Sequence, residues 1–352
     1  MKKRQTHRLG LVEYIWPDGQ NPSKLRSKTI VSNRELKKLG DIPEQSFDGS
    51  STFQAEPGYS DLTLKPVLFC PDPIRGFPNI LALCEVFKND GKPHESNTRA
   101  ILRGCVEKYK KEKPLVGIEQ EYVLYDPDGG RPFRWPQNST SFPAPQGNYY
   151  CGVGSDEVYG GELPEAHLYA CLKAGLGIGG KHPEVMPAQW EFQTKPLPPL
   201  ELCDQLLLMR WILYKLGEKF GISVKLHPKP IQEGDWNGTG LHTNFDTAKM
   251  RKPGGIKHIK EACERLSKFH LEHIKVYGED NHLRLTGAHE TCRIDEFKSE
   301  IASRNASIRI PMKVFRKKRG YLEDRRPAAN ADPYMVCVAL METICGDGFK
   351  TQ

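Results

Sequence analysis

Hydrophobic positions in the first part of the chain come in short runs separated by turn residues. Residues 9–32 hold two such runs on either side of the turn Pro17-Asp18-Gly19, which predicts a β-hairpin. The runs at residues 62–69 and 80–87 predict further strands, with proline-rich turns between them. We therefore expect a small β-rich domain over residues 1–97.

Beyond this region apolar residues recur with helical spacing, and the expected helices alternate with strands. Helices are expected at residues 96–111, 162–174, 200–220 and 256–277. A last helix should begin after Asp332, an N-cap residue followed by Pro333, and should end at Gly346. The pattern predicts a larger α+β domain over residues 98–352.

One predicted strand carries two charged residues in its middle. The sequence of residues 116–125 is VGIEQEYVLY, which has the β-branched and aromatic composition of a strand. Because side chains alternate between the faces of a strand, Glu119 and Glu121 share one face and Gln120 points to the other. An unpaired buried carboxylate costs on the order of several kcal/mol, so these glutamates need partners.

Further polar groups stand in apolar or glycine-rich surroundings later in the chain. They are Glu184 and Glu191 in residues 184–193, which we expect to be extended, His242 after a glycine-rich turn, and Glu323. Their partners could be arginines in structural ion pairs, and the candidates are Arg284, Arg304, Arg309, Arg325 and Arg326. Alternatively, an oxygen-rich ligand set with one imidazole suits Mg²⁺ or Mn²⁺. The arginines would then be free to bind phosphate and carboxylate, as in phosphoryl transfer.

A glycine-rich segment imitates a nucleotide-binding loop. Residues 175–181, GLGIGGK, match the dinucleotide fingerprint and most of a P-loop. A P-loop needs Ser or Thr after its lysine, but His182 stands there, and the segment follows a helical stretch instead of a strand. We interpret it as a helix-to-strand connection.

Composition excludes several classes of protein. With 38% hydrophobic and 27% charged residues the chain has a globular composition. No segment approaches the roughly 18 apolar residues of a membrane span, and the basic residues 1–8 precede no signal-like run, so a cytoplasmic protein without a membrane partner is expected. The ten cysteines lack paired spacing, which favours reduced thiols.

The net charge of +7 could indicate a polyanionic partner. Its clearest cluster is residues 313–319, KVFRKKR, and no nucleic-acid-binding motif surrounds it. We therefore expect a solvated surface and no nucleic-acid partner. A position of residues 316–319 close to a phosphate ligand stays open as an alternative.

Motifs spread along nearly the whole chain resemble those of the glutamine synthetases of the eukaryotic-type class II, the glutamate-ammonia ligases. The resemblance runs from about Tyr14 to Glu342. The motifs are residues 47–52 (FDGSST), 119–122 (EQEY), 152–154 (GVG), 184–193 (EVMPAQWEFQ), 237–244 (NGTGLHTN), 284–291 (RLTGAHET), 306–311 (ASIRIP) and 323–327 (EDRRP).

The resemblance implies a fold and an activity. The fold would be a β-grasp-like N-terminal domain followed by a catalytic domain whose curved antiparallel sheet is lined by metal-binding carboxylates and flanked by helices. The activity would be ATP-dependent ligation of ammonia to the γ-carboxylate of L-glutamate through γ-glutamyl phosphate, in nitrogen assimilation. Two or three Mg²⁺ or Mn²⁺ ions per active site are implied. So is a homo-oligomer of stacked rings, such as a decamer, with active sites shared between adjacent subunits.

The metal ligands implied by the resemblance form two sets. The set near the glutamate substrate is Glu121, Glu184 and Glu191. The set near the ATP phosphates is Glu119, His242 and Glu323.

The resemblance also implies roles for the arginines. The side chains of Arg304, Arg309 and Arg325 would stabilise the transferring phosphoryl group, with Arg325 also close to the glutamate. The glutamate α-carboxylate would be held by Arg284, together with the turn at Asn237 and Gly238.

The remaining implied roles concern ammonium and the nucleotide. Asp48 would attract and deprotonate ammonium, in a pocket completed by Tyr150 and Glu184. Glu290 resembles a flap glutamate that shields the acyl phosphate from water. The residues implied to face ATP are Glu119, Asn244, Arg251, Arg304, Arg309 and Tyr321.

One position departs from the family pattern, and two alternatives stay open. Asp246 stands where the family usually has serine, and its carboxylate would repel phosphate unless it is paired, for example with Arg251. One alternative is a related ligase for a larger amine, against which Asp48 and Glu290 argue. The other is a catalytically silent structural relative, which loss of metal ligands would favour.

Overall fold

The structure is a computed structural model that describes residues 9–135 and 149–351. The basic residues 1–8 lie outside this part. The first five strands form one sheet in the order β2-β1-β5-β4-β3. They are β1 (Gly10–Pro17), β2 (Leu25–Ser32), β3 (Gln45–Asp48), β4 (Asp61–Pro71) and β5 (Ile80–Phe87). The predicted hairpin is confirmed, because β1 and β2 pair antiparallel over their full length.

The remaining strands form an eight-stranded sheet in the order β11-β12-β13-β10-β6-β8-β7, with β9 also paired to β6. They are β6 (Leu115–Tyr125), β7 (Ile178–Pro183), β8 (Gln189–Thr194), β9 (Ser223–Lys225), β10 (Leu241–Asp246), β11 (Ser299–Ile301), β12 (Ile308–Ile310) and β13 (Leu322–Asp324). All neighbours pair antiparallel except β11 and β12 at the edge. The strand with the two glutamates, β6, lies inside this sheet.

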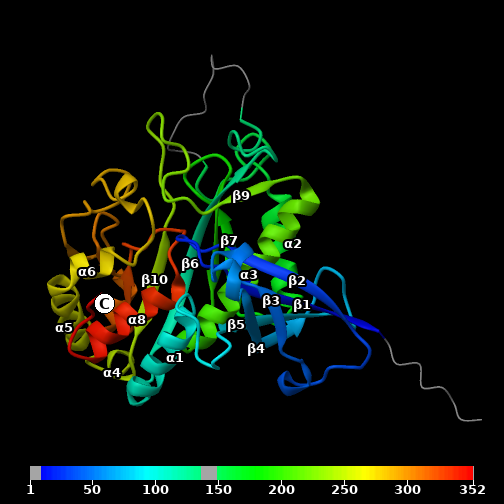
Figure 1. Cartoon of the computed structure of the whole chain (residues 1–352). Coiled ribbons are helices and arrows are strands. Elements are labelled where there is room, and N and C mark those ends of the chain that lie inside the picture. The colour runs from blue at the N-terminus through cyan, green and yellow to red at the C-terminus, as the bar shows by residue number, and fades with distance from the viewer. Residues whose placement is uncertain (1–8, 136–148, 352) are drawn as a thin grey trace, which may run out of the picture.

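Helices flank the larger sheet (Figure 1). They are α1 (Thr98–Tyr109), α2 (Glu162–Lys173), α3 (Pro199–Phe220), α4 (Ala248–Arg251), α5 (Ile256–Lys268), α6 (His270–Ile274), α7 (Met312–Lys317) and α8 (Pro333–Cys345). The start of α8 agrees with the prediction, because the Asp332 side chain accepts a hydrogen bond from the Tyr334 N–H and Pro333 opens the helix. Residues 174–177 connect α2 to β7, so the glycine-rich segment lies between a helix and a strand, as interpreted from the sequence.

The two sheets share part of one hydrophobic core. Ile15, Leu81 and Leu83 of the small sheet belong to the main cluster, together with residues of α1, α3 and α8. Arg99 at the start of α1 reinforces this junction, because it forms ion pairs with Glu85 of β5 and with Asp204 of α3. The boundary near residue 97 falls between the two sheets in sequence, and the division into two domains stays a prediction.

Two elements differ from the prediction. The helix expected at residues 256–277 is broken at Phe269, whose backbone (φ −113°, ψ 16°) separates α5 from α6. The segment expected to be extended from Glu184 begins instead with a turn, and β8 starts only at Gln189. Ala188, after Pro187, has a φ of 63°, which a strand does not contain. An apolar composition alone did not reveal this turn.

All ten cysteines are free thiols, and nine of them are at least partly buried. Reduced cysteines were predicted. No helix within residues 9–135 and 149–351 is long and apolar enough to cross a membrane.

Candidate active site

Strand register places the candidate ligands in rows across the larger sheet. On one side of β6, Glu119 lies opposite His242 of β10. On the other side, Glu121 lies opposite Glu191 of β8, which in turn lies opposite His182 of β7. Glu119 and Glu121 therefore face one cavity, as strand alternation predicts, whereas the Gln120 side chain accepts a hydrogen bond from Arg210 on the other face.

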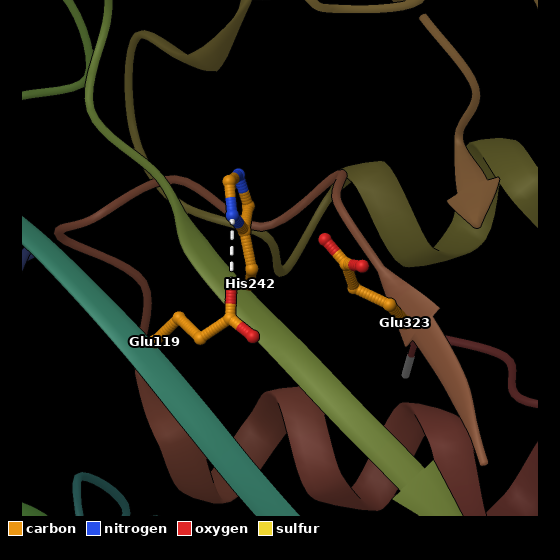
Figure 2. Close-up of side chains that lie close together, drawn as sticks. All are labelled: Glu119, His242 and Glu323. Atoms are coloured by element: carbon orange, nitrogen blue, oxygen red, sulfur yellow. Dashed lines mark ion pairs between the residues drawn. The ribbon is translucent and has the colours of Figure 1, made fainter. Parts of the chain in front are cut away.

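The first ligand group combines three strands (Figure 2). Oxygen and nitrogen atoms of Glu119, His242 and Glu323 lie within 4.8 Å of one another. The His242 Nδ1 atom is 3.6 Å from a carboxylate oxygen of Glu119. These three residues are the set that the sequence resemblance implies near the ATP phosphates.

The second predicted set is divided over two overlapping groups. Glu121 and Glu191 approach His242 in one group, and Glu184 and Glu191 approach His182 in the other. The His182 Nε2 atom is 3.0 Å from Glu184 and 3.8 Å from Glu191. His182 is not among the ligands predicted from the sequence, where it serves only to exclude a P-loop. Its placement two residues before Glu184 was the signal that could have included it.

Burial and mutual repulsion shape the electrostatics of the cavity. Burial raises the pKa of Glu191 well above its usual value, and the neighbouring Glu119, Glu184 and Glu121 raise it further. The pKa of Glu121 is raised as well, mainly by burial. Burial lowers the pKa of His242 to about 4, helped by nearby arginine charge, so its imidazole is neutral and able to act as a ligand. The crowded oxygens and the neutral His242 imidazole fit a hard divalent cation.

Arginines close one side of the cavity around Glu323. Arg309 and Arg325 form ion pairs with this carboxylate, at 2.7 and 2.6 Å. Arg309 lies opposite Glu323 in the register of β12 and β13. Both guanidinium groups therefore reach the same space as the first ligand group.

A third arginine is held against a glycine turn. The buried Arg284 contacts the His242 Nε2 atom at 3.1 Å. A Cβ atom at Gly240 would come within 2.5 Å of the Arg284 Nη2 atom, and one at Gly238 would come within 2.6 Å of the Pro228 carbonyl oxygen. Burial lowers the pKa of Arg284 to about 10, which leaves the guanidinium charged at neutral pH. The glycines thus make room for a cation deep in the cavity.

The outer part of the cavity is built from a loop and exposed side chains. Glu290 stands at a φ of 61° and forms an ion pair with Arg304 at 3.1 Å. The Arg304 guanidinium lies 5.5 Å from the Tyr150 ring centre, and this ring packs edge-on against His182. Glu290, Arg304 and Tyr150 therefore form a continuous rim around the cavity.

Most of the predicted site residues line one cavity of about 240 Å³. They are Glu119, Glu121, Tyr150, Glu184, Glu191, Asn237, Gly238, His242, Arg284, Glu290, Arg304, Arg309, Glu323 and Arg325, joined by His182, Gln193, His289 and Thr291. Four predicted residues are not part of its lining.

The four residues outside the lining have other surroundings. Asp48 is exposed at the end of β3, and hydrogen bonds from Ser50 and Ser51 lower its pKa to about 2. Asn244 donates to Glu119 at 2.9 Å and so stands next to the cavity. Tyr321 is exposed two residues before Glu323.

Arg251 pairs with Asp246, as the sequence analysis suggested for this departure. Burial raises the pKa of Asp246 to about 6, and Arg251 opposes that rise. Arg251 also donates to the Lys113 carbonyl oxygen, so its guanidinium is already engaged. Within the basic segment 313–319, residues 316–319 are exposed at and just beyond the end of α7, in agreement with a solvated surface.

The fold and the site define a class of protein: an α+β protein whose antiparallel sheet carries carboxylates, histidines and arginines into one polar cavity. A sequence model described as the catalytic domain of glutamine synthetase matches residues 95–274. The chain is 53% identical to a chloroplastic glutamine synthetase of Chlamydomonas reinhardtii, over 94% of this chain and 90% of that protein. It is 52% identical to a glutamine synthetase of Gallus gallus, over 94% of this chain and 88% of that protein.

The chain belongs to the glutamine synthetase family. Its fold also matches a solved structure of Plasmodium falciparum glutamine synthetase, with a TM-score of 0.78 and 18% identity, over 97% of this chain and 72% of that one. This match confirms the predicted fold class. One similar protein carries the word chloroplastic in its name, so the cellular location of this chain stays a prediction.

Proposed function

We propose that the protein ligates ammonia to the γ-carboxylate of L-glutamate at the expense of ATP, through γ-glutamyl phosphate. The observation that carries this proposal is the meeting of acidic ligands, histidines and arginines in one cavity of a chain that is about half identical to glutamine synthetases. None of the predicted metal ligands is missing from the cavity, which argues against a silent structural relative.

The donor set supports at least two divalent cations. Glu119, His242 and Glu323 would hold one, and Glu121, Glu184 and Glu191 would hold another, with His182 as an added donor. Bound there, Mg²⁺ or Mn²⁺ would supply Lewis acidity and neutralise phosphate charge. Without a cation the buried carboxylates repel one another, so they are arranged to bind one.

The arginines would bind the phosphoryl group and the glutamate. Arg309 and Arg325 already converge on Glu323, and in-line transfer of a γ-phosphoryl group needs such preorganised positive charge. Arg284 is buried at the bottom of the cavity next to the Gly238 turn, where it would pair with the α-carboxylate. The α-carboxylate of the substrate would thereby balance the positive charge of Arg284, which is otherwise only partly balanced.

Protection and amination of the acyl phosphate would fall to the rim. Glu290 would cover the cavity, held by Arg304, and would exclude water from the intermediate. Asp48 would bind and deprotonate ammonium, with Tyr150 and Glu184. Because its pKa is low and its carboxylate is exposed, Asp48 is ionised and available to attract a cation.

The position of Asp48 supports a shared active site. It lies on the small sheet and does not line the cavity of its own chain. In a ring oligomer the Asp48 loop of one subunit would complete the cavity of the next. Asn244 and Tyr321 would face the nucleotide beside Glu119, whereas the engaged Arg251 would act on it mainly by neutralising Asp246.

The direct test is an assay of the purified protein with Mg²⁺, ATP, glutamate and ammonium. We expect glutamine and ADP in equal amounts. If ATP and metal bind but no ammonium-dependent ADP release occurs, the proposal is wrong. Replacing ammonium by small amines distinguishes the related ligase, which would prefer the larger nucleophile.

Subunit sharing is tested by complementation. Chains carrying Asp48→Ala and chains carrying Glu323→Gln are each expected to be inactive, and they can be mixed by reversible dissociation. If active sites are shared, some sites in mixed oligomers contain neither substitution, and activity returns in part. No recovery, in oligomers shown to be mixed, would place both residues in the site of one chain.

A further inference from the structure

A second and larger cavity lies away from the carboxylates. It encloses about 720 Å³ between the β1–β2 turn, α3, β9 and the start of α8. Its wall is mixed: Leu207, Leu226 and Met335 supply apolar surface, and Arg210 supplies a cation. A cavity of this size lies within the range of small-molecule sites.

Arg210 is the residue that gives this cavity its chemistry. Its side chain on α3 is 7% exposed, yet its hydrogen bonds go only to neutral oxygens, those of Gln120, Ala329 and Ala331. Within the described ranges no carboxylate forms an ion pair with it. The acidic groups that influence its charge are first Tyr214 and then Asp332, whose carboxylate caps α8. A buried guanidinium without an anionic partner is costly, and a carboxylate offers it two parallel hydrogen bonds.

The other charges around the cavity also favour an anion. Lys24 and Lys225 line it, and neither takes part in an ion pair within the described residues. The carboxylates in its lining, Asp18, Glu279 and Asp332, already accept hydrogen bonds. Asp18 forms an ion pair with Arg26 and accepts backbone hydrogen bonds, and Glu279 accepts from Asn21. An incoming anion would therefore meet free positive charge at Lys24 and at Arg210.

Two short connections join this cavity to the active site. Arg210 donates to Gln120 at 2.8 Å, and Gln120 stands between Glu119 and Glu121 on β6. The backbone of His227, which lines the cavity, accepts a hydrogen bond from the Thr239 hydroxyl, next to Gly238 and Gly240. An occupant that moves Arg210 or His227 would thus displace groups that carry the ligands and the glycine turn.

We propose that this cavity is a second binding site for a small carboxylate with an apolar body, held by Arg210 and attracted by Lys24 and Lys225. The body packs on Leu207, Leu226 and Met335. Occupancy changes the active site through Gln120 and Thr239. Binding is independent of the proposed function; only the effect on activity rests on it.

Binding is tested with 4-fluorophenylacetate, followed by ¹⁹F NMR of the probe. The full-length protein is first saturated with Mg²⁺, ADP and glutamate, so that the active site cannot take the probe. We expect saturable binding with a dissociation constant of about 1 mM or lower, and at least about tenfold weaker binding of 4-fluorophenylacetamide, which has the same shape but no charge. No saturation by about 10 mM, or equal binding of acid and amide, overturns the proposal.

Variants locate the probe. Met335→Trp and Leu226→Trp fill the cavity from two walls, and each should weaken binding at least about tenfold, as should Arg210→Met. Thermal melting identifies any variant that fails to fold, and the two filling variants are independent of each other. Retained binding in a folded filling variant places the probe elsewhere and contradicts the proposal.

Charge at the cavity is tested with a matched pair of double variants. Lys24→Glu with Lys225→Glu should weaken binding about three- to tenfold at low salt. Lys173→Glu with Lys219→Glu makes the same change in net charge at exposed positions that do not line the cavity, and should have less than a twofold effect. Equal effects of the two pairs would show that binding depends on net charge alone, which contradicts the attraction proposed for Lys24 and Lys225. In glutamine formation, the probe should shift the KM for glutamate at least twofold, and Met335→Trp should abolish the shift.

Discussion

Two neighbouring acidic residues on β13 face opposite sides of the larger sheet and have opposite environments. Asp324 points into the helix-packed core, where Arg326 grips both of its oxygens and the Tyr277 hydroxyl donates a further hydrogen bond. Glu323 points into the cavity, where it meets two arginines and the ligands Glu119 and His242. Both side chains are at most 2% exposed.

A structural carboxylate and a binding carboxylate thus differ in how far their charge is balanced. The pKa of Asp324 is lowered although burial alone would raise it, because Arg326 and its hydrogen bonds outweigh desolvation. The cavity carboxylates Glu121 and Glu191 have raised pKa values, because burial and neighbouring acids are not fully balanced. A satisfied pair stabilises the fold, whereas an unbalanced group is arranged to receive a cation.

The largest effect on stability is expected in the core. Asp324→Asn leaves the Arg326 guanidinium buried without its anion, which should lower the free energy of unfolding by about 3–5 kcal/mol. Chemical denaturation with urea measures the loss. A loss below about 1 kcal/mol would show that Tyr277 and the histidines around Arg326 suffice to hold it.

Glu323→Gln should have the opposite effects: a large loss of activity and a small change in stability. It removes an anionic ligand and a partner of Arg309 and Arg325, so kcat/KM for ATP should fall about 10²–10³-fold. Since Arg309 and Arg325 stay partly exposed at the cavity, where water can solvate them, the free energy of unfolding without metal should change by less than about 1 kcal/mol. Steady-state assays and urea denaturation on the same preparation give both numbers. Equal damage to stability and activity would remove the distinction between the two faces.

A buried histidine on the core side should make stability depend on pH. His167 of α2 is buried against Phe192, and burial lowers its pKa to about 4 from an unfolded value near 6.5. Between these values the unfolded chain binds the proton and the folded chain does not, so stability falls as pH decreases from about 6.5 to 4. The full contribution is roughly 3 kcal/mol. Urea denaturation at several pH values gives the free energy of unfolding as a function of pH, and this dependence should be weaker in His167→Gln. An unchanged pH dependence would contradict this assignment.

The smallest effect is expected where repulsion is relieved. Glu191→Gln removes one charge from the crowded group, so the metal-free protein should gain about 1 kcal/mol of stability. It should also lose part of the stabilisation that Mg²⁺ gives the wild-type protein by binding only the folded state. Thermal melts with Mg²⁺ and with EDTA measure both terms. A variant that is less stable than wild type in EDTA would show that Glu191 is not under repulsion.

Much of the fold and of the site follows from local patterns. Strand alternation placed Glu119 and Glu121 on one face, and capping residues located α8, because both rules depend on neighbouring residues only. The sequence pattern does not show that Glu323 and Asp324 have different environments. In so short a strand, alternation places the two side chains on opposite faces but does not say which face is the core. It also missed His182 and the turn before Gln189. These depend on how β7 and β8 pair, which is a long-range property.

The glycine turn beside Arg284 has a consequence for how this protein tolerates change. Neither Gly238 nor Gly240 contributes a side chain, yet a methyl group at either would overlap the Pro228 carbonyl or the arginine. Here the missing atoms are themselves the functional feature, since they leave the space that the guanidinium occupies. In a mutational scan both positions would therefore reject even alanine, and a survey that credits only chemically reactive residues would overlook them.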